Sequence, residues 1–440
     1  MRRAGALAAC LAAVVLGASP GPSFQTVKLP GGGTGIVRPL AGAPIAAVQL
    51  WFRAPSIGFE ASPQPGIANL AAYAVAASVP LTGTPLGTLV ARAGGRFGIS
   101  VYPRTIAISA LVPASQAASV LRAMSADYFT PVLTQAGLTQ AIAAVRQDAR
   151  LRALASPEET LRDAVFGALF TGGPNHYSPT GDEADPSALG LDAVRAFATR
   201  AFRASNATIV LTGAVNADLA GAAVEGRGEG GVAEELTSGV AQVEKTPQPL
   251  TRKGPVAGFG YAWPGPPIKN EEEATALDFI ADYLFNPDTG TVARAVAGTD
   301  VSINAQFVTY YDPGVLFVEA TGSRAPFVRA AIDAALAAMR TPLDPKLFVA
   351  ARNAFEYHVT SDVSTPLSLA DNFGWYASEG NVEYAPGADL DGGRYVRSVR
   401  ALTPQSVAAT AAKYLSGPPA VVMLAVGSLN APPPTPAPKR

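Results

Sequence analysis

The amino-acid sequence predicts an α+β protein of two homologous domains, each a mostly antiparallel sheet covered by helices on one side. Three observations lead to this prediction. At 440 residues, 48% of them hydrophobic, the chain is long enough for two cores of ordinary size. Strand-like and helical runs follow one another in the same order twice. Corresponding positions in the two repeats also keep a nearly constant spacing.

The first domain, residues 23–220, is divided into elements by the spacing of its apolar residues and by its Gly and Pro residues. Its predicted strands are 46–53, 97–102, 105–112 and 207–215. Its predicted helices are 66–78, 115–128, 138–170 with an interruption near Ser156-Pro157, and 191–201. The second and third strands are joined at Pro103-Arg104.

The second domain, residues 256–430, repeats this order. Its predicted strands are 257–263, 301–309, 314–320 and 420–426. Its predicted helices are 273–284, 325–339, 346–361 with a continuation beyond Pro366, and 404–415. Three pairs of landmarks measure the repeat: Ala47 and Ala257 are 210 residues apart, as are Leu111 and Thr321, while Ile209 and Val421 are 212 apart. This regularity indicates a duplicated domain.

Three further segments are predicted to lie outside the domains. Residues 1–22 read as a secretory signal peptide, because Met1-Arg2-Arg3 precedes an apolar run that ends at Ala18. Residues 221–255, rich in Gly, Glu and Thr, read as a linker, and residues 431–440, with five prolines, as an extended tail. The apolar run is too short to cross a bilayer comfortably. We therefore expect a periplasmic or otherwise exported protein without a transmembrane segment after signal cleavage.

The charge and cysteine content narrow the function classes. The net charge is −1 with scattered Lys and Arg, so we expect no nucleic-acid partner. The only cysteine, Cys10, lies in the signal segment, where Leu7-Ala8-Ala9-Cys10 resembles a lipoprotein-processing box. The apolar run before it is unusually short, so lipid anchoring through Cys10 is the less favoured alternative. In either case no disulfide stabilises the mature chain.

Residues 66–73, Gly-Ile-Ala-Asn-Leu-Ala-Ala-Tyr, form the most informative pattern. An inverted zinc motif, His-x-x-Glu-His, places two imidazoles one helical turn apart and a glutamate that activates the bound water. Here those three positions hold Asn69, Ala72 and Tyr73. Asn is a poor zinc ligand, Ala has no group that transfers protons, and Tyr stays protonated near neutral pH. The pattern predicts a helix with no catalytic residues and no metal site.

With this layout, residues 25–430 resemble the M16 (pitrilysin/insulinase-like) metallopeptidase family in its short two-domain form. The resemblance rests on the first strand, Glu60, Gly66-Ile67-Ala68, Ala93-Gly94-Gly95, and Asn175-His176-Tyr177-Ser178 followed by Gly181. The third zinc ligand of the family, a Glu, falls at Asp148-Ala149 in this chain. One carboxylate alone does not hold zinc. The resemblance therefore implies a degenerate, non-catalytic member.

The resemblance also implies a function. In this family two bowl-shaped halves enclose a chamber, and in some members a degenerate chain closes the chamber while a second chain holds the zinc. We expect a heterodimer with a zinc-bearing M16 subunit, in which the zinc resides in that partner and this chain needs no cofactor. A peptide substrate would add as a strand along Phe97, Gly98, Ile99, Ser100, Val101 and Tyr102. The alternative is a stand-alone peptide-binding or scaffolding protein of the cell envelope.

Other chemistry has weaker support in the sequence. The only histidines, His176 and His358, lie in different halves, and the one Gly-x-Ser-x-Gly match, at 17–21, falls in the signal cleavage zone. The glycine pattern at 226–231 matches a dinucleotide fingerprint in letters only, because no amphipathic helix follows it. An active peptidase with an unconventional metal site is a third alternative, although no His, Cys, Asp and Glu cluster has ligand spacing.

Overall fold

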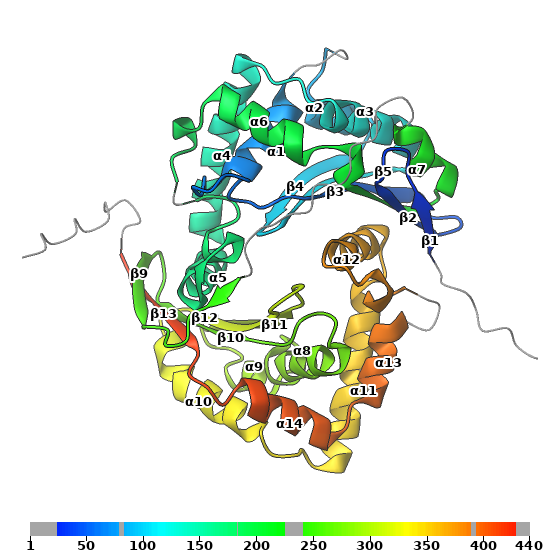
Figure 1. Cartoon of the computed structure of the whole chain (residues 1–440). Coiled ribbons are helices and arrows are strands. Elements are labelled where there is room, and N and C mark those ends of the chain that lie inside the picture. Colours follow the sequence, from blue (N-terminus) through cyan, green and yellow to red (C-terminus); the bar gives the residue numbers. More distant parts are fainter. Residues whose placement is uncertain (1–23, 79–82, 183, 225–240, 389–392, 428–440) are drawn as a thin grey trace, which may run out of the picture.

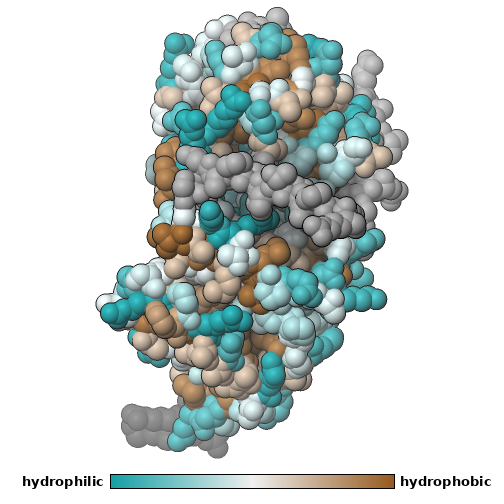
Figure 2. Space-filling view, turned by 90° about the vertical axis from the view of Figure 1, so that its left-hand side faces the viewer, coloured by the Kyte–Doolittle hydropathy of each residue, from teal (hydrophilic) through white to brown (hydrophobic). Residues whose placement is uncertain are grey.

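The computed structural model describes residues 24–78, 83–182, 184–224, 241–388 and 393–427. Within them the chain forms two large sheets, each backed by helices, that face one another across the middle of the molecule (Figure 1). Seen from the left of that view, the two halves stack one above the other (Figure 2). The predicted α+β class with two similar halves is confirmed. The predicted signal peptide with Cys10, much of the linker and the Pro-rich tail lie outside the described residues.

The first sheet has six strands in the order β1-β2-β7-β3-β5-β4, and only the β2–β7 pair is parallel. The strands are β1 Gln25–Lys28, β2 Thr34–Pro39, β3 Ile45–Arg53, β4 Arg96–Tyr102, β5 Thr105–Pro113 and β7 Ala207–Gly213. Its outer face is covered by α1 Ile67–Ala77, α2 Leu86–Arg92, α3 Ala117–Phe129, α4 Gln135–Ala155, α6 Leu191–Ala201 and α7 Ala217–Val224. The buried residues of this half include alternate positions of β3, as expected for a strand with one face against helices.

The second sheet has five strands in the order β11-β12-β10-β13-β9, and only the β13–β9 pair is parallel. The strands are β9 Leu250–Gly254, β10 Gly258–Pro264, β11 Ser302–Val308, β12 Val315–Thr321 and β13 Ala420–Val426. The helices are α8 Glu271–Phe285, α9 Thr291–Ala295, α10 Ala325–Ala338, α11 Pro345–Asp362, α13 Gly393–Ala401 and α14 Pro404–Tyr414. Strand β9 comes from the end of the predicted linker. No helix in the described ranges has the length and apolarity needed to cross a membrane.

One helix from each half packs on the inner face of the other half's sheet. Helix α5, Pro157–Leu169, belongs to the first half by sequence but packs against β10, β12 and β13. Helix α12, Pro366–Ser378, belongs to the second half but packs against β3 and β7 (Figure 1). Gly260 on β10 allows the close approach of α5, because a Cβ there would lie 3.1 Å from Leu161. This exchange of helices joins the two halves.

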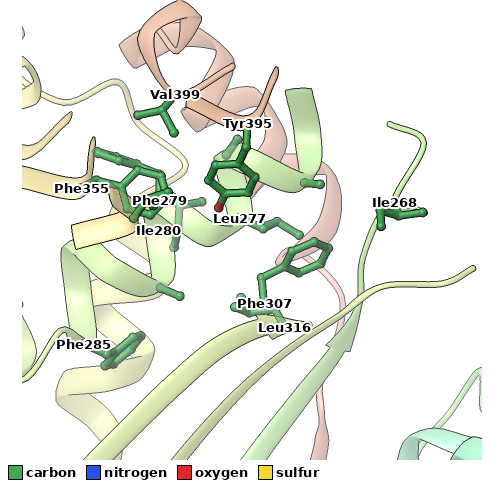
Figure 3. Close-up of a cluster of buried hydrophobic side chains, with 14 of the residues drawn as sticks. Ile268, Leu277, Phe279, Ile280, Phe285, Phe307, Leu316, Phe355, Tyr395 and Val399 are labelled. Atoms are coloured by element: carbon green, nitrogen blue, oxygen red, sulfur yellow. The ribbon is translucent and has the colours of Figure 1, made fainter. Parts of the chain in front are cut away.

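The core of the second half forms around α8. Leu277, Phe279 and Ile280 on this helix point toward side chains from β11, β12 and α11 (Figure 3). Phe279 lies with its ring centroid 5.8 Å from that of Phe355 on α11, in an edge-on arrangement. These contacts hold α8 between the sheet and α11, and so fix the wall of the cavity described below.

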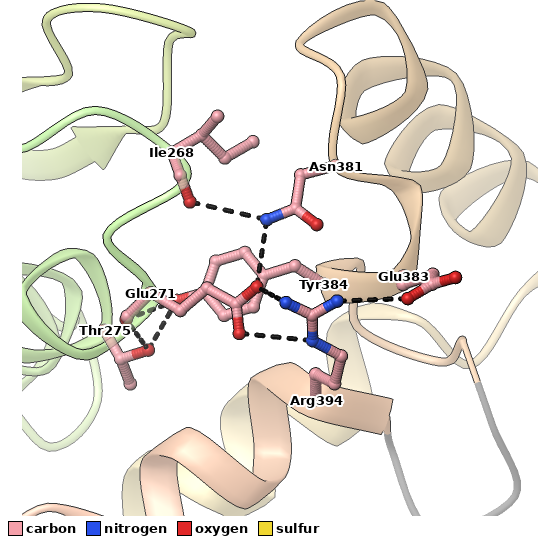
Figure 4. A network of polar contacts seen from close by, with 7 residues as sticks. All are labelled: Ile268, Glu271, Thr275, Asn381, Glu383, Tyr384 and Arg394. Carbon is pink, nitrogen blue, oxygen red and sulfur yellow. Dashed lines mark hydrogen bonds and ion pairs between the residues drawn. The ribbon is translucent and has the colours of Figure 1, made fainter.

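A polar network fixes the start of α8. The Glu271 carboxylate in its first turn forms an ion pair with Arg394 and accepts a hydrogen bond from the Asn381 amide at 3.0 Å (Figure 4). Arg394 also pairs with Glu383 at 3.0 Å. Glu271, Glu272 and Glu273 thus place negative charge in the first turn of α8, where the helix dipole favours it.

The pairing registers show how the two halves correspond. Ala47 lies opposite Leu111 in the β3–β5 ladder, and Gly258 lies opposite Thr321 in the β10–β12 ladder. The two predicted landmark pairs therefore differ by one residue: if Leu111 corresponds to Thr321, the equivalent of Ala47 is Gly258, next to the predicted Ala257. Because side chains on a strand alternate between its two faces, a shift of one residue would exchange the core side for the cavity side.

Candidate functional site

Two glycines that carry the family resemblance meet at the start of α1. Gly66, with φ 83°, precedes the helix and packs against Gly181, with φ 72°. A Cβ on Gly181 would lie 2.3 Å from the Gly66 Cα, so only glycine permits this approach. The contact places the loop around residue 180 beside the helix whose positions would carry a zinc motif.

Asn69 and Ala72 are both buried on α1. The Asn69 side chain is 3% exposed, and its amide donates to the Thr180 carbonyl at 3.1 Å. Ala72 is fully buried, and its carbonyl accepts a hydrogen bond from the Tyr128 hydroxyl at 2.9 Å. These two motif positions therefore hold α1 against its neighbours.

Tyr73 reaches the position that corresponds to the third zinc ligand. Its hydroxyl donates to the carboxylate of Asp148 on α4, across 75 residues of sequence. Burial, followed by the hydrogen bond and the charge of Asp148, raises the pKa of Tyr73 above its usual value. The phenol stays neutral, so the pair is a hydrogen bond between α1 and α4.

Zinc does not fit this set of side chains. The Asp148 carboxylate already accepts a hydrogen bond from the Tyr73 hydroxyl, and the Asn69 amide donates one to a carbonyl oxygen. The Ala72 side chain has no atom that can bind a metal. A zinc site needs at least three nitrogen, sulfur or carboxylate ligands around one point. In the described parts of the chain, no three His, Cys, Asp or Glu side chains come together in such a way.

A second polar network ties the neighbouring helices to the loop at 178–182. Arg152 on α4 forms a two-pronged ion pair with Asp182, with Nη2–Oδ1 at 2.5 Å and Nε–Oδ2 at 3.0 Å. Ser178 donates to Asp163 on α5 at 2.6 Å. His176 places Nδ1 2.5 Å from the carbonyl oxygen of Phe170, as fits a structural histidine in a loop. The sequence segment that carried the resemblance thus joins α1, α4 and α5.

A cavity of about 710 Å³ lies between the two halves. Its wall comes from both halves of the sequence: α5 and the end of β4 belong to the first, and β11, α8, α11 and α12 belong to the second. Three aromatic side chains line it where the halves meet. The Tyr102 ring stacks on Trp51 with centroids 5.9 Å apart and meets Trp375 of α12 edge-on at 5.1 Å.

The predicted peptide strand coincides with β4, at one edge of the first sheet. Only its end, Val101 and Tyr102, lines the cavity. Phe97, Gly98 and Ile99 are half-buried along the edge, and Ser100 is exposed. The structure thus brings the strand's last two residues to the cavity and leaves the other four on the edge leading to it.

Most residues of the cavity wall were not predicted from the sequence. His358 on α11 and Asp282 on α8 both line the cavity, with Nδ1 and Oδ1 2.9 Å apart. Burial raises the pKa of Asp282, although the adjacent His358 opposes this effect. The one available signal was a histidine on a long helix. Nothing in the sequence pairs it with an aspartate 76 residues away.

The comparisons with known proteins agree with this geometry. A family model described as the peptidase M16 inactive domain matches residues 188–355. A protease from Helicobacter pylori has a similar structure, with 17% identity and a TM-score of 0.79 over 92% of this chain and 99% of that one. A peptidase M16 inactive domain from Pseudomonas fluorescens has 16% identity and a TM-score of 0.73 over 93% and 99%.

A similar fold also occurs in a chain of a complex. A chain of complex III2 from Candida albicans has 14% identity and a TM-score of 0.69, over 91% of this chain and 94% of that one. No curated protein sequence matches the chain significantly. The resemblance to the M16 family is confirmed by these findings: residues 188–355 match the inactive domain of that family, and the chain shares the fold of M16-like peptidases.

Proposed function

We propose that this protein is a non-catalytic M16-type homologue that binds peptide between its two halves and closes the chamber of a zinc-bearing M16 partner. One observation carries the proposal. The two-halved shell and its cavity are present, while the three motif positions of α1 hold Asn69, Ala72 and Tyr73, each engaged in packing or hydrogen bonding. The chemistry of hydrolysis would then be supplied by the partner, which would hold the zinc.

Peptide binding is supported by the place of β4 in the first sheet. An edge strand has unpaired backbone N–H and C=O groups along one side, which an extended peptide can pair with. The strand runs from the sheet edge into the cavity, where Tyr102 and two tryptophans offer flat apolar surfaces. A peptide added to β4 would therefore enter the space between the halves.

Hydrogen exchange with a bound peptide tests this step. The first sheet has a second edge strand, β1, which is not part of the cavity wall and serves as an internal control. We expect an unfolded peptide to slow exchange of backbone amides in residues 97–102 and to leave residues 25–28 unchanged. Protection of both edges alike, or of neither, would argue against binding along β4.

The partner and the compartment follow from the same proposal. The sequence of residues 1–22 favours export, so the heterodimer would work in the periplasm or another exported location. The test is to purify the chain together with a zinc-bearing M16 homologue encoded beside it. We expect a stable heterodimer and peptide cleavage only in the mixture. Cleavage by either chain alone, at the rate of the mixture, would overturn the proposed division of labour.

A second candidate is a stand-alone peptide-binding or scaffolding protein of the envelope. Its support is the similar fold of a chain in complex III2 from Candida albicans, which is part of a larger assembly. This candidate predicts peptide binding, or stable membership of an assembly, without any zinc-bearing M16 chain. Light scattering on the purified protein with and without the neighbouring homologue separates the two candidates.

A further inference from the structure

We propose that Glu379, the residue that follows α12, is a proton-sensitive latch for the turn between β11 and β12, residues 309–314. The protonated carboxyl group holds the tip of this turn, residues 311–313, against the end of α12, and ionisation of the group loosens the tip. The tip follows directly on Thr309 and Tyr310, which line the cavity. The latch would therefore couple the pH to this part of the cavity wall. It works without a bound peptide and so does not depend on the proposed function.

Two side chains at the end of α12 hold the turn. Glu379 is 4% exposed, and its Oε2 accepts a hydrogen bond from the backbone N–H of Tyr311 at 2.5 Å. One helical turn earlier, Trp375 donates its indole N–H to the Thr309 hydroxyl at 3.2 Å. The Trp375 ring also lies against that of Tyr310, with centroids 5.5 Å apart. Of these contacts, the one through the Glu379 carboxyl group is the one that can change its charge near neutral pH.

The tip is the part of the turn that ionisation can release. On the side away from α12, backbone hydrogen bonds join the turn to the segment before α8. The N–H of Ile268 donates to the Tyr310 carbonyl at 3.0 Å, and the N–H of Gly265 donates to the Gly314 carbonyl at 2.7 Å. These bonds hold the residues on either side of the tip. Tyr311 itself is held by Glu379, while its own side chain is 58% exposed.

The charged groups around Glu379 come from both halves. Burial raises the pKa of Glu379 to about 7, against the opposing effects of the hydrogen bond that it accepts and of Arg104 and Arg53. Arg53 ends β3 and donates to the Ala377 carbonyl of α12 at 3.0 Å, while Arg104 lies between β4 and β5. On the turn itself, burial followed by the charge of Glu379 raises the pKa of Tyr310, so this phenol stays neutral.

The direction of the pH effect follows from the burial of Glu379. Once the tip is released, water reaches the carboxyl group and its pKa returns toward the usual value, near 4.3. Between about pH 4 and 7 the held state therefore keeps a proton that the released state has lost. The held state is most favoured below about pH 4, becomes less favoured as the pH rises, and levels off above about pH 7. A neutral carboxyl group still accepts the Tyr311 hydrogen bond, whereas an ionised one gains free energy by reaching water.

Hydrogen exchange of the turn tests the latch. The full chain, without peptide, would be followed by mass spectrometry between pH 5 and 8, with rates corrected for the intrinsic pH dependence of exchange. We expect the protection of the Tyr311 amide, read in fragments that contain residues 309–314, to fall about tenfold or more over this range. Glu379→Gln keeps an acceptor for the amide and mimics the protonated group. This variant should stay protected at every pH.

Two further variants make the result specific. Arg104→Gln removes a cation that favours the ionised carboxylate, so the fall in protection should extend to higher pH. This variant also serves if Glu379→Gln lowers the yield of folded protein. Glu60→Gln is the matched control, because the Glu60 side chain is 67% exposed and pairs with Arg200, and it should keep the wild-type profile. Protection that does not change with pH in the wild type, or a wild-type profile in both Glu379→Gln and Arg104→Gln, would overturn the latch.

Discussion

The hydroxyl of Tyr73 donates a hydrogen bond to the carboxylate of Asp148, and so joins the two helices that a zinc ion would bridge in an active M16 enzyme. The two residues occupy the positions of the second and third metal ligands that the family resemblance predicts. A hydrogen bond from a neutral phenol to a carboxylate connects α1 and α4 at that point. The side chains at these two positions join the helices through a hydrogen bond, and this contact has measurable consequences.

A double-mutant cycle tests the Tyr73–Asp148 contact. Tyr73→Phe and Asp148→Asn should each lower the free energy of unfolding by about 1 kcal/mol, because each removes one partner of a partly buried hydrogen bond. The double variant should cost less than the sum of the two, with a coupling energy of roughly 1 kcal/mol. Urea denaturation measures all three values. Tyr357→Phe, on an exposed side chain, should combine additively with Asp148→Asn.

Zinc binding should return when two ligands are restored. In the variant Asn69→His/Tyr73→His, two imidazoles would stand one turn apart on α1 and Asp148 would lose its phenol partner. We expect the zinc content, measured by atomic emission, to rise from well below one to about one per chain. Ala72 stays unchanged, since its side chain is fully buried and a glutamate there would be costly. Adding Asp148→Asn should abolish the gain, and a variant that stays metal-free would show that Asp148 is not placed as a ligand.

The helix exchange depends on Gly374 of α12. A Cβ at this position would lie 2.0 Å from the indole of Trp51 on β3, so Gly374→Ala must push α12 away from the first sheet. The hydrogen bond from Gln49 to Asp371, at 2.6 Å, would be lost as well. We expect a loss of roughly 1–3 kcal/mol or more, seen as a lower Tm with altered tryptophan fluorescence. Gly417→Ala, where the Cβ meets no atom within 4 Å, should leave both unchanged.

The stability should fall as the pH rises through the weakly acidic range. Burial raises the pKa of Asp278, whose carboxylate accepts a hydrogen bond from Tyr395, to about 7. An unfolded aspartate titrates near pH 3.9, so between about pH 4 and 7 the folded state binds the extra proton. The free energy of unfolding then decreases with pH, by at most about 1.4 kcal/mol per unit for this group, and levels off above about pH 7.

Urea denaturation at several pH values checks this sign. Asp278→Asn should flatten the decrease between pH 5 and 7 relative to the wild type. Asp192→Asn, where the side chain is 97% exposed, should leave the pH profile as it is. A profile that is equally steep in wild type and Asp278→Asn would show that the buried aspartate is ionised throughout.

Most strands of the two sheets, and most helices that cover them, could be predicted because the residues that define them are neighbours in the sequence. Strands β3, β4 and β5 and helix α6 begin and end within a residue or two of their predicted bounds, since apolar spacing and Gly or Pro residues mark them. Strands β1, β2 and β9 were missed, because short polar or glycine-rich runs read as loop until a neighbouring strand supplies their hydrogen bonds.

The sequence by itself determined the duplicated α+β plan and the loss of zinc ligands at Asn69, Ala72 and Tyr73, because residue type and helical spacing alone decide which side chains can share one metal. Only the tertiary structure decided that α5 and α12 exchange sheets and that Tyr73 meets Asp148. It also left a buried oxygen of Asn175 on the cavity wall without a hydrogen-bond partner. Contacts of this kind join residues far apart in sequence, and the burial that gives them their energy exists only after both halves have packed together.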